Sequence, residues 1–318
     1  MTEFASEKER ELMLLVKRRT IFLYLLPIIV MILFINMSPI LYTLYLSFTN
    51  NTEFNQSYAF VGLKNYLELL FTSNSDLYYV LGLTILYVIV CVALFVVIGM
   101  VTALALNHPK VKGTAVWMSL LLVPWAAPSA ITALIWKFLF NYDFGPINQI
   151  GRLFLGQHFG VPWLTNPVAA FAAVVIVNVW LSYPFFTVVI LGALQSVPRE
   201  LTEAASVDGA NGWQAFWQVT FPQLRPAITP ITILSAITTF QMFNTVYLIT
   251  QGGPITNADK PGATTFVMIY MYNQVLGASA ANIHYAQIAA FSISIFIILG
   301  ALTFLARALG TSGSEARA

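Results

Sequence analysis

Two strongly apolar stretches of the sequence carry neutral polar side chains that could hold a ligand within a membrane. The first contains VNVWLSYPFF and the second contains SAITTFQMFNTVYLIT. Their polar and aromatic side chains include Asn178, Trp180, Ser182, Tyr183, Ser235, Thr238, Thr239, Gln241, Asn244 and Thr245. Aromatic rings stack on the faces of sugars, while amides and hydroxyls form hydrogen bonds with sugar hydroxyl groups. The two stretches therefore predict a cavity for an uncharged polyhydroxylated solute, because a free amino acid or a phosphate ester would find no counter-ion there.

The spacing of these residues along a helix ranks them. Ser235 and Thr239 are four residues apart and share a helix face. Ser235 and Asn244 are nine residues apart, or about two and a half turns, so they point in different directions. We therefore expect Ser235, Thr239 and Ser182 to contact a solute more directly than Asn244. The alternative is that the polar groups only hold helices together, as small and amide side chains do in membranes.

Composition places these stretches in an integral membrane protein. Of the 318 residues, 58% are hydrophobic and 9% are charged, whereas soluble domains carry roughly 25% charged residues. A bilayer span needs about 20 residues, and six apolar stretches have that length, at residues 21–48, 78–106, 114–136, 167–194, 227–249 and 284–305. We predict an all-α, polytopic membrane protein with six transmembrane helices. Residues 1–20 form an N-terminal segment, residues 21–309 the membrane domain and residues 310–318 a tail.

The distribution of positive charge predicts the orientation of the chain. Of the 15 Lys and Arg residues, eleven lie in the two termini or in the two connections that share a side with them. The other four lie on the opposite side or at the adjoining end of the third predicted span. Lys and Arg are retained on the cytoplasmic side of membranes. We therefore expect a multi-pass protein of the cell membrane with both termini and residues 196–226 in the cytoplasm.

The polar segment of residues 196–226 separates the two apolar stretches and has the pattern of two short helices. Gly209 supplies a stop, because glycine readily adopts the left-handed conformation that ends many helices. Asn211 can cap a second, amphipathic helix. Pro222 and Pro226 are expected to close the unit, because proline disrupts the interior of a helix.

The same segment carries an extended motif. Glu203-Ala204-Ala205 is followed by Gly209, and nine residues separate Gly209 from Val219-x-Phe221-Pro222. This pattern resembles the EAA loop of ABC importer permeases, with Val219 in place of isoleucine and Phe221 in place of leucine. The resemblance implies a cytoplasmic coupling helix pair that docks in a cleft of a partner ATPase through Glu203, Ala204, Ala205, Asp208, Gly209 and Pro222. From composition alone, an interfacial loop that packs against lipid headgroups is the alternative.

The resemblance extends beyond this loop. VNVWLSYPFF, the EAA-like segment and NTVYLITQGGP follow one another in the order and spacing of the maltose-type carbohydrate permeases, over at least residues 167–309. It implies a second homologous permease, two ABC ATPase subunits and an extracytoplasmic sugar-binding protein as partners. Membrane lipid is a further expected partner, and nucleic acid is not one.

The family's transmembrane sugar site also maps onto the sequence. The matching positions are Leu181, Ser182, Phe185, Ser235, Thr239 and Met242. Ser182 replaces a glycine of the family, Phe185 a tyrosine, and Thr239 and Met242 each an asparagine. Together with the polar residues above, the predicted substrate-binding set is Leu181, Ser182, Tyr183, Phe185, Ser235, Thr239, Gln241 and Asn244.

Other functional classes lack the residues that they need. A proton-coupled carrier needs relay carboxylates, which the predicted spans lack, although sodium coupling through backbone carbonyls stays open. No G-x-x-x-x-G-K motif occurs, so we expect ATP and magnesium to bind to the partner ATPase and not to this chain. One cysteine, Cys91, and three scattered histidines give no metal cluster, and no nucleophile–base arrangement indicates an enzyme. A glycerol-3-phosphate-type ABC permease and an ion-coupled secondary sugar carrier remain as alternatives.

Overall fold

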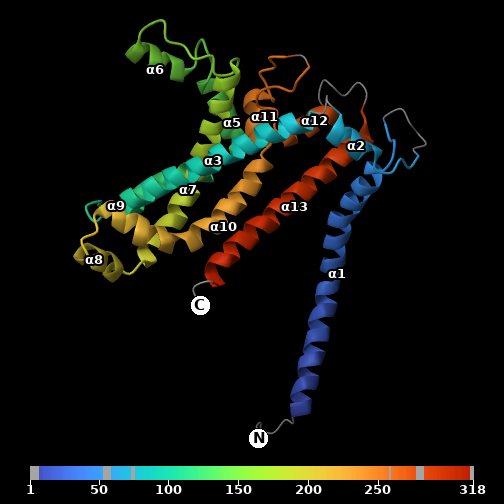
Figure 1. The fold of residues 1–318 in the computed structure, drawn as a ribbon, viewed down its shortest axis with the longest axis horizontal. Coiled ribbons are helices and arrows are strands. Elements are labelled where there is room, and N and C mark those ends of the chain that lie inside the picture. The colour runs from blue at the N-terminus through green and yellow to red at the C-terminus, as the bar shows by residue number, and fades with distance from the viewer. Residues whose placement is uncertain (1–6, 53–58, 73–75, 258, 277–282, 316–318) are drawn as a thin grey trace. The chain divides into compact units, whose positions relative to one another are not determined.

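The computed structural model describes residues 7–52, 59–72, 76–257, 259–276 and 283–315, and these ranges are predominantly helical (Figure 1). The helices are α1 Glu7–Ser47, α2 Lys64–Phe71, α3 Leu77–Leu106, α4 Thr114–Ala126, α5 Ser129–Leu139, α6 Pro146–Leu155, α7 Pro167–Ser196, α8 Arg199–Val207, α9 Gly212–Ala215, the π-helix η1 Phe216–Thr220, α10 Phe221–Phe240, α11 Asn244–Thr250, α12 Val267–Leu276 and α13 Tyr285–Glu315. In these ranges β-type pairing is limited to an isolated bridge between Thr49 and Phe60. The predicted all-α class is therefore confirmed for the described residues. Residues 1–6 and 316–318 of the predicted terminal segments lie outside them.

The chain divides into two compact units. One unit contains residues 1–71 and 282–295, and the other contains residues 72–281 and 296–318. In the first unit, the amide of Asn65 in α2 ties down the end of α1. Its Nδ2 atom donates to the carbonyl oxygens of Ser47 and Thr49, at 2.8 Å each. The Tyr66 hydroxyl adds a hydrogen bond of 2.6 Å to the Ser47 hydroxyl.

The core of the second unit is built on α3 and α7. The two helices approach closely at Gly99, where a Cβ atom would lie only 2.5 Å from the Cβ atom of Phe186. The hydroxyls of Thr102 and Thr187 are hydrogen-bonded across the same contact at 2.5 Å. Because glycine has no side chain, the backbones can come near enough for this contact, as is common between membrane helices. Helices α4, α10 and α11 pack against this pair, and α11 also packs against α5.

Candidate membrane spans among the described residues are of two kinds. Thr20–Ser47 of α1, together with α3 and α7, are straight candidates that are long and apolar enough to cross a bilayer. Two further candidates are bent: α4 and α5 meet at 90°, and the helix that runs through α10 meets α11 at 44°. The third predicted span is therefore broken between α4 and α5, and the fifth is bent between α10 and α11. The apolar part of α13, Tyr285–Ala301, falls below the length required here, so the sixth span and the count of six stay predictions.

Proline explains the sharper of the two bends. α4 ends at Ala126, and the next residue, Ala127, is extended with φ −72° and ψ 139°, directly before Pro128. The ring of a proline excludes the preceding residue from the helical region. Pro124 lies inside α4 and Pro184 lies inside α7, and neither proline ends its helix. Both prolines are buried. A proline in the sequence therefore does not by itself predict whether a membrane helix breaks or continues. Neighbouring groups can satisfy the carbonyl oxygen that the proline leaves without a donor.

Candidate functional site

The first half of the polar segment folds as the sequence predicted. α8 ends in a turn at Gly209, which has a φ of +85°. The N–H of Ala210 donates to the carbonyl of Ala205 at 2.9 Å, and the N–H of Gly209 donates to that of Ser206 at 3.1 Å. These bonds satisfy carbonyl groups that the end of a helix leaves without partners. Glycine is favoured at position 209 because this left-handed conformation strains other residues.

The second half differs from the prediction at its end. Asn211 caps α9 as expected, through reciprocal hydrogen bonds of 2.9 Å with Gln214. However, α9 continues through η1 into α10, so the prediction that Pro222 and Pro226 close the unit is wrong. Pro222 lies in the first turn of α10, and the N–H of Phe221 reaches back five residues to Phe216. The wider π-turn and the position of Pro222 allow the chain to stay helical, because proline is tolerated where the missing N–H is not required.

The polar segment, which we call the α8–η1 loop, presents its side chains outward. No residue of α8, α9 or η1 is buried within the chain. Glu203, Ala204 and Asp208 of the predicted coupling set are exposed, and Ala205 is half-buried. Trp213 is 72% exposed. A charged helix with small side chains beside an aromatic one is a surface that can dock against a protein.

An aromatic cluster connects this loop to the start of α10. Trp217 lies with its ring centroid 5.6 Å from that of Trp213 and 4.8 Å from that of Phe221. The Arg225 guanidinium lies 5.3 Å from the Phe221 ring centroid. The cluster links α9, η1 and α10 through side chains as well as through the continuous backbone, so motion of the loop would reach α10.

The predicted ligand-binding residues of α7 are largely engaged in packing. Asn178 is fully buried, and the Ser182 hydroxyl lies 3.4 Å from its Oδ1 atom. The Phe185 ring stacks on Trp125 of α4, with centroids 6.0 Å apart, and Trp180 contacts Trp136 of α5 edge-on at 5.9 Å. Leu181, Ser182, Tyr183 and Phe185 are all half-buried. The α7 residues therefore border the two halves of the α4–α5 break.

The other predicted ligand-binding residues lie near the break between α10 and α11, and they differ in how exposed they are. Gln241, at the end of α10, and Asn244, at the start of α11, are exposed, whereas Ser235 is half-buried. Thr239 is only 3% exposed. The ranking of Thr239 above Asn244 assumed helical spacing from Ser235 to Asn244, which the 44° bend interrupts. Among Ser235, Thr239, Gln241 and Asn244, the exposed side chains in this conformation are the two amides that flank the break.

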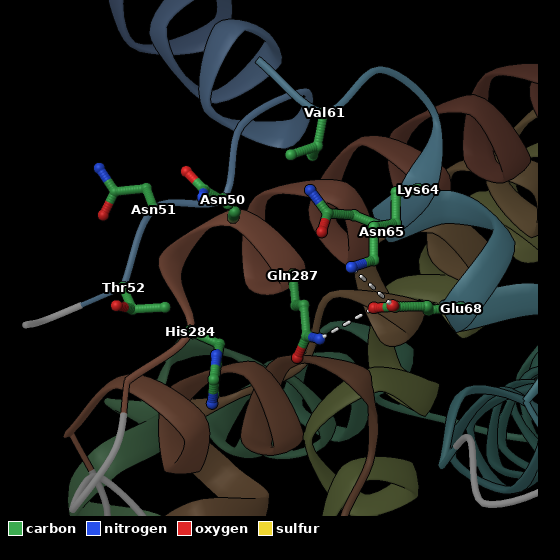
Figure 2. A pocket seen from close by; sticks show the side chains of 10 residues that line it. Asn50, Asn51, Thr52, Val61, Lys64, Asn65, Glu68, His284 and Gln287 are labelled. Carbon is green, nitrogen blue, oxygen red and sulfur yellow. Dashed lines mark hydrogen bonds and ion pairs between the residues drawn. The ribbon is translucent and has the colours of Figure 1, made fainter. Parts of the chain in front are cut away.

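A separate pocket lies in the first unit (Figure 2). Its volume is about 200 Å³, and its lining is Asn50, Asn51, Thr52, Val61, Lys64, Asn65, Glu68, His284, Ala286 and Gln287. The Glu68 carboxylate accepts a hydrogen bond of 3.3 Å from the Gln287 amide and lies 3.8 Å from the Lys64 ammonium. The sequence analysis did not identify this pocket, because its residues come from three separate stretches of the chain.

The ionisable groups of the described residues do not form a metal-binding cluster. No group of three or more His, Cys, Asp or Glu side chains in the described ranges could hold a metal ion. Asp76, directly before α3, accepts a hydrogen bond of 3.2 Å from the Tyr270 hydroxyl. Burial raises the pKa of Asp76, and the Tyr270 hydrogen bond opposes this rise. Burial, with the nearby Asp76 carboxylate, raises the pKa of Tyr270 to about 12.

Comparison with known proteins extends this description. Residues 95–311 match the family described as binding-protein-dependent transport system inner membrane components. The chain is 35% identical over 252 residues to a trehalose/maltose transport system permease protein of Thermococcus litoralis, covering 79% of this chain and 82% of that protein. It is 32% identical over 291 residues to a maltodextrin transport system permease protein of Bacillus subtilis, covering 88% of this chain and 66% of that protein.

A solved structure supports the fold. The chain resembles a component of a bacterial ABC transporter that imports the acidic polysaccharide alginate, with a TM-score of 0.70 and 19% identity. The alignment covers 96% of this chain and 99% of that chain. At this identity the match establishes the arrangement of helices alone. It agrees with the polytopic helical membrane fold described above.

Proposed function

Since the chain belongs to the family of binding-protein-dependent transport system inner membrane components, we propose that it is the permease subunit of an ABC importer for a sugar. The solute is a maltose- or maltodextrin-like oligosaccharide. The observation that carries this substrate class is the similarity to trehalose/maltose and maltodextrin permeases over most of this chain.

The chemistry of the membrane helices favours an uncharged solute. α7 and α11 contain no Asp, Glu, Lys, Arg or His. The exposed amides of Gln241 and Asn244 flank a break between helices, and breaks of this kind form ligand sites in other transporters. Neutral amides bind sugar hydroxyls as both donors and acceptors. A glycerol-3-phosphate-type permease would need a cation for the phosphate, which neither α7 nor α11 offers.

The α8–η1 loop is the proposed contact with the ATPase. Glu203, Ala204, Ala205, Asp208 and Gly209 form or end its first helix, and Pro222 lies where the loop becomes α10. The permease would act with a second homologous permease, two ATPase subunits and an extracytoplasmic sugar-binding protein. ATP and magnesium would bind to the ATPase subunits, so this chain would itself carry out no hydrolysis.

Transport by the assembled complex tests this function. The chain is co-expressed with a candidate second permease, ATPase and sugar-binding protein of the same organism, and the complex is reconstituted in vesicles that contain ATP and magnesium. We expect labelled maltodextrin to accumulate only when the binding protein is supplied outside. Uptake driven by a sodium or proton gradient without ATP would indicate a secondary carrier. Uptake of glycerol-3-phosphate instead of the sugar would indicate the other permease class.

The proposed orientation has its own test. Both termini and the α8–η1 loop are placed in the cytoplasm because most Lys and Arg residues lie on that side. In a Cys91→Ala background, Asn257→Cys should react with an impermeant thiol reagent added to intact cells, and Ser314→Cys should react only after lysis. Labelling of Ser314→Cys in intact cells would reverse the orientation.

A further inference from the structure

The segment between α5 and α7 contains a short helix, α6, whose inner face is fixed by hydrogen bonds to backbone groups. Asn148 is fully buried. Its Nδ2 atom donates to the carbonyl oxygens of Tyr142 and Val161, at 3.2 and 3.0 Å. Its Oδ1 atom accepts from the Val161 N–H at 3.1 Å and from the Trp163 indole N–H at 3.2 Å. α6 is therefore held in a defined position by the chain that follows it.

Arg152 turns its charge toward the same inner face. Its guanidinium donates to the carbonyl oxygens of Phe159, Asp143 and Tyr142, at 3.1, 3.3 and 3.1 Å respectively. It also lies 5.8 Å from the centroid of the Tyr142 ring. Arg152 is the single cation of α6. Because its donors are used within the segment, the charge does not project from the opposite face of the helix.

The opposite face of α6 is apolar and exposed. Ile150, Leu153 and Phe154 stand at positions i, i+3 and i+4, which lie on one side of a helix. Leu153 is 78% exposed and Phe154 is 82% exposed. Leu155, at the end of the helix, is also exposed. These residues form an uncharged surface, which we call the α6 face, and the rest of the segment holds it rigidly.

The chain directly before α6 contacts the exposed apolar surface of α5. Phe138, on α5, contacts Phe144 with ring centroids 5.8 Å apart, and both rings are more than half exposed. Leu134, one turn earlier on α5, is also exposed. Along the chain, α6 lies between α5 and α7 (Figure 1). α7 meets the length and composition of a membrane span by itself, and α5 meets them together with α4. The segment therefore sits where the chain leaves and re-enters the membrane.

We propose that α6 lies along the lipid–water boundary, with the α6 face among phospholipid acyl chains. A helix with one apolar and one polar face adopts this position when its apolar residues are large. A protein partner is disfavoured by the chemistry of the face, since reversible protein interfaces contain about one hydrogen bond per 100–200 Å² of buried surface. Ile150, Leu153, Phe154 and Leu155 offer no side-chain donor or acceptor. This membrane anchor is additional to the transport function proposed above.

Lipid-dependent quenching tests the anchor. In a Cys91→Ala background, the Phe154→Cys and Ile150→Cys variants are each labelled with an environment-sensitive fluorophore. Gln149→Cys is the matched control, because Gln149 lies on the same helix and its amide donates to the Phe144 carbonyl. The full-length chain is reconstituted, with the partners that co-purify with it, in phosphatidylcholine vesicles with and without brominated acyl chains.

We expect emission from the Phe154→Cys and Ile150→Cys labels to be blue-shifted and to fall when brominated lipid is present. Emission from the Gln149→Cys label should change much less. Two results would overturn the proposal. One is equal quenching of all three labels or of none. The other is an emission change at Phe154→Cys that requires the sugar-binding protein and not the brominated lipid, which would assign the α6 face to a protein partner.

Discussion

α6 and the α8–η1 loop are two short helical segments that flank the same 30-residue helix, α7, one at each end. Both expose large hydrophobic side chains, such as Phe154 on α6 and Trp213 on the loop. They differ in where their polar groups point. In α6, Asn148 and Arg152 use their donors on nearby carbonyl groups, whereas Glu203 and Asp208 of the loop project outward. Both segments expose apolar side chains. We therefore base the proposed lipid contact of α6 and the proposed protein contact of the loop on whether the polar side chains bond within the chain or point outward.

The two segments also differ in how they are held. The α6 segment is fixed by side chains that reach residues as far as 15 positions away, as from Asn148 to Trp163. The α8–η1 loop depends on short-range features, namely the Gly209 turn and the reciprocal bonds of Asn211 and Gln214. A loop with mostly local bonds can move as a unit while its helices persist. This property fits a segment that transmits motion, and the α6 arrangement fits an anchor.

The largest effect is expected from proline at the two left-handed glycines. Gly209 and Gly156 have φ values of +85° and +98°, and a Cβ atom would meet nothing within 4 Å at either. Proline cannot adopt these angles. Strain of about 1–3 kcal/mol corresponds to roughly a 5-fold to 150-fold loss of the native turn. Gly209→Pro should abolish most sugar-stimulated ATP hydrolysis in the assembled complex, and Gly156→Pro should leave most of it intact.

The same two variants can contradict the proposed difference between the α8–η1 loop and the α6 segment. Normal stimulated hydrolysis in a correctly inserted Gly209→Pro complex would mean that the loop does not transmit motion. An equal loss in Gly156→Pro would mean that the α6 segment contributes to coupling as well. Insertion and assembly are checked by size-exclusion chromatography of the purified complex.

A strong local effect is expected from Asn148→Leu. This change leaves the Val161 N–H and the Trp163 indole N–H without their acceptor, the Asn148 Oδ1 atom. The carbonyls of Tyr142 and Val161 each lose one of two donors and keep the bond from Arg152 or from the Trp163 backbone N–H. Each unsatisfied buried group costs about 1–3 kcal/mol, so the α6 segment should open locally while α7 stays folded. Amide hydrogen exchange should accelerate in residues 146–163 and remain unchanged in the α8–η1 loop. Gln149→Leu is the control, and faster exchange in the loop would show that the two segments are not independent.

A smaller effect is expected when the helix cap in the α8–η1 loop, or the one beside the α6 segment, is removed. Asn211 caps α9, and Asn166 caps α7 beside the α6 segment by accepting hydrogen bonds of 3.0 and 3.1 Å. Loss of such a cap costs about 1 kcal/mol in either case. Asn211→Ala should reduce stimulated ATP hydrolysis a few-fold, whereas Asn166→Ala should lower thermal stability without a comparable loss. Equal kinetic effects would contradict the assignment of coupling to the loop alone.

The smallest effect concerns the break between α10 and α11, where the loop's motion would reach a ligand. The loss of one neutral hydrogen bond costs about 0.5–1.5 kcal/mol. Gln241→Leu should therefore raise the sugar concentration for half-maximal uptake several-fold. Thr239→Val should change it less, because Thr239 is buried and valine preserves its shape. A larger effect at Thr239 than at Gln241 would indicate that transport opens the helix surface which this conformation buries.

Local sequence features predicted much of the α8–η1 loop. The stop at Gly209 and the cap at Asn211 depend on backbone preferences and on bonds between residues three to five positions apart, so composition and order sufficed. The same reasoning failed at Pro222 and Pro226, because a proline ends a helix only if the surrounding structure leaves its lost hydrogen bond unsatisfied. It also did not predict α6, since the apolar face there is short and the role of Arg152 depends on carbonyls that follow in the chain.

The amino-acid sequence was enough to predict a helical membrane protein with a polar, capped loop between two apolar stretches. Hydrophobicity and turn preferences depend on residues that are neighbours in the chain, so they can be read without the fold. The solvent exposure of individual polar side chains could be found only from the folded structure. Thr239 is buried and Gln241 is exposed because α10 ends at Phe240 and the chain bends before α11. Helical spacing fixes the direction of a side chain only within one straight helix. Where packing bends the chain, contacts between distant residues set the direction instead.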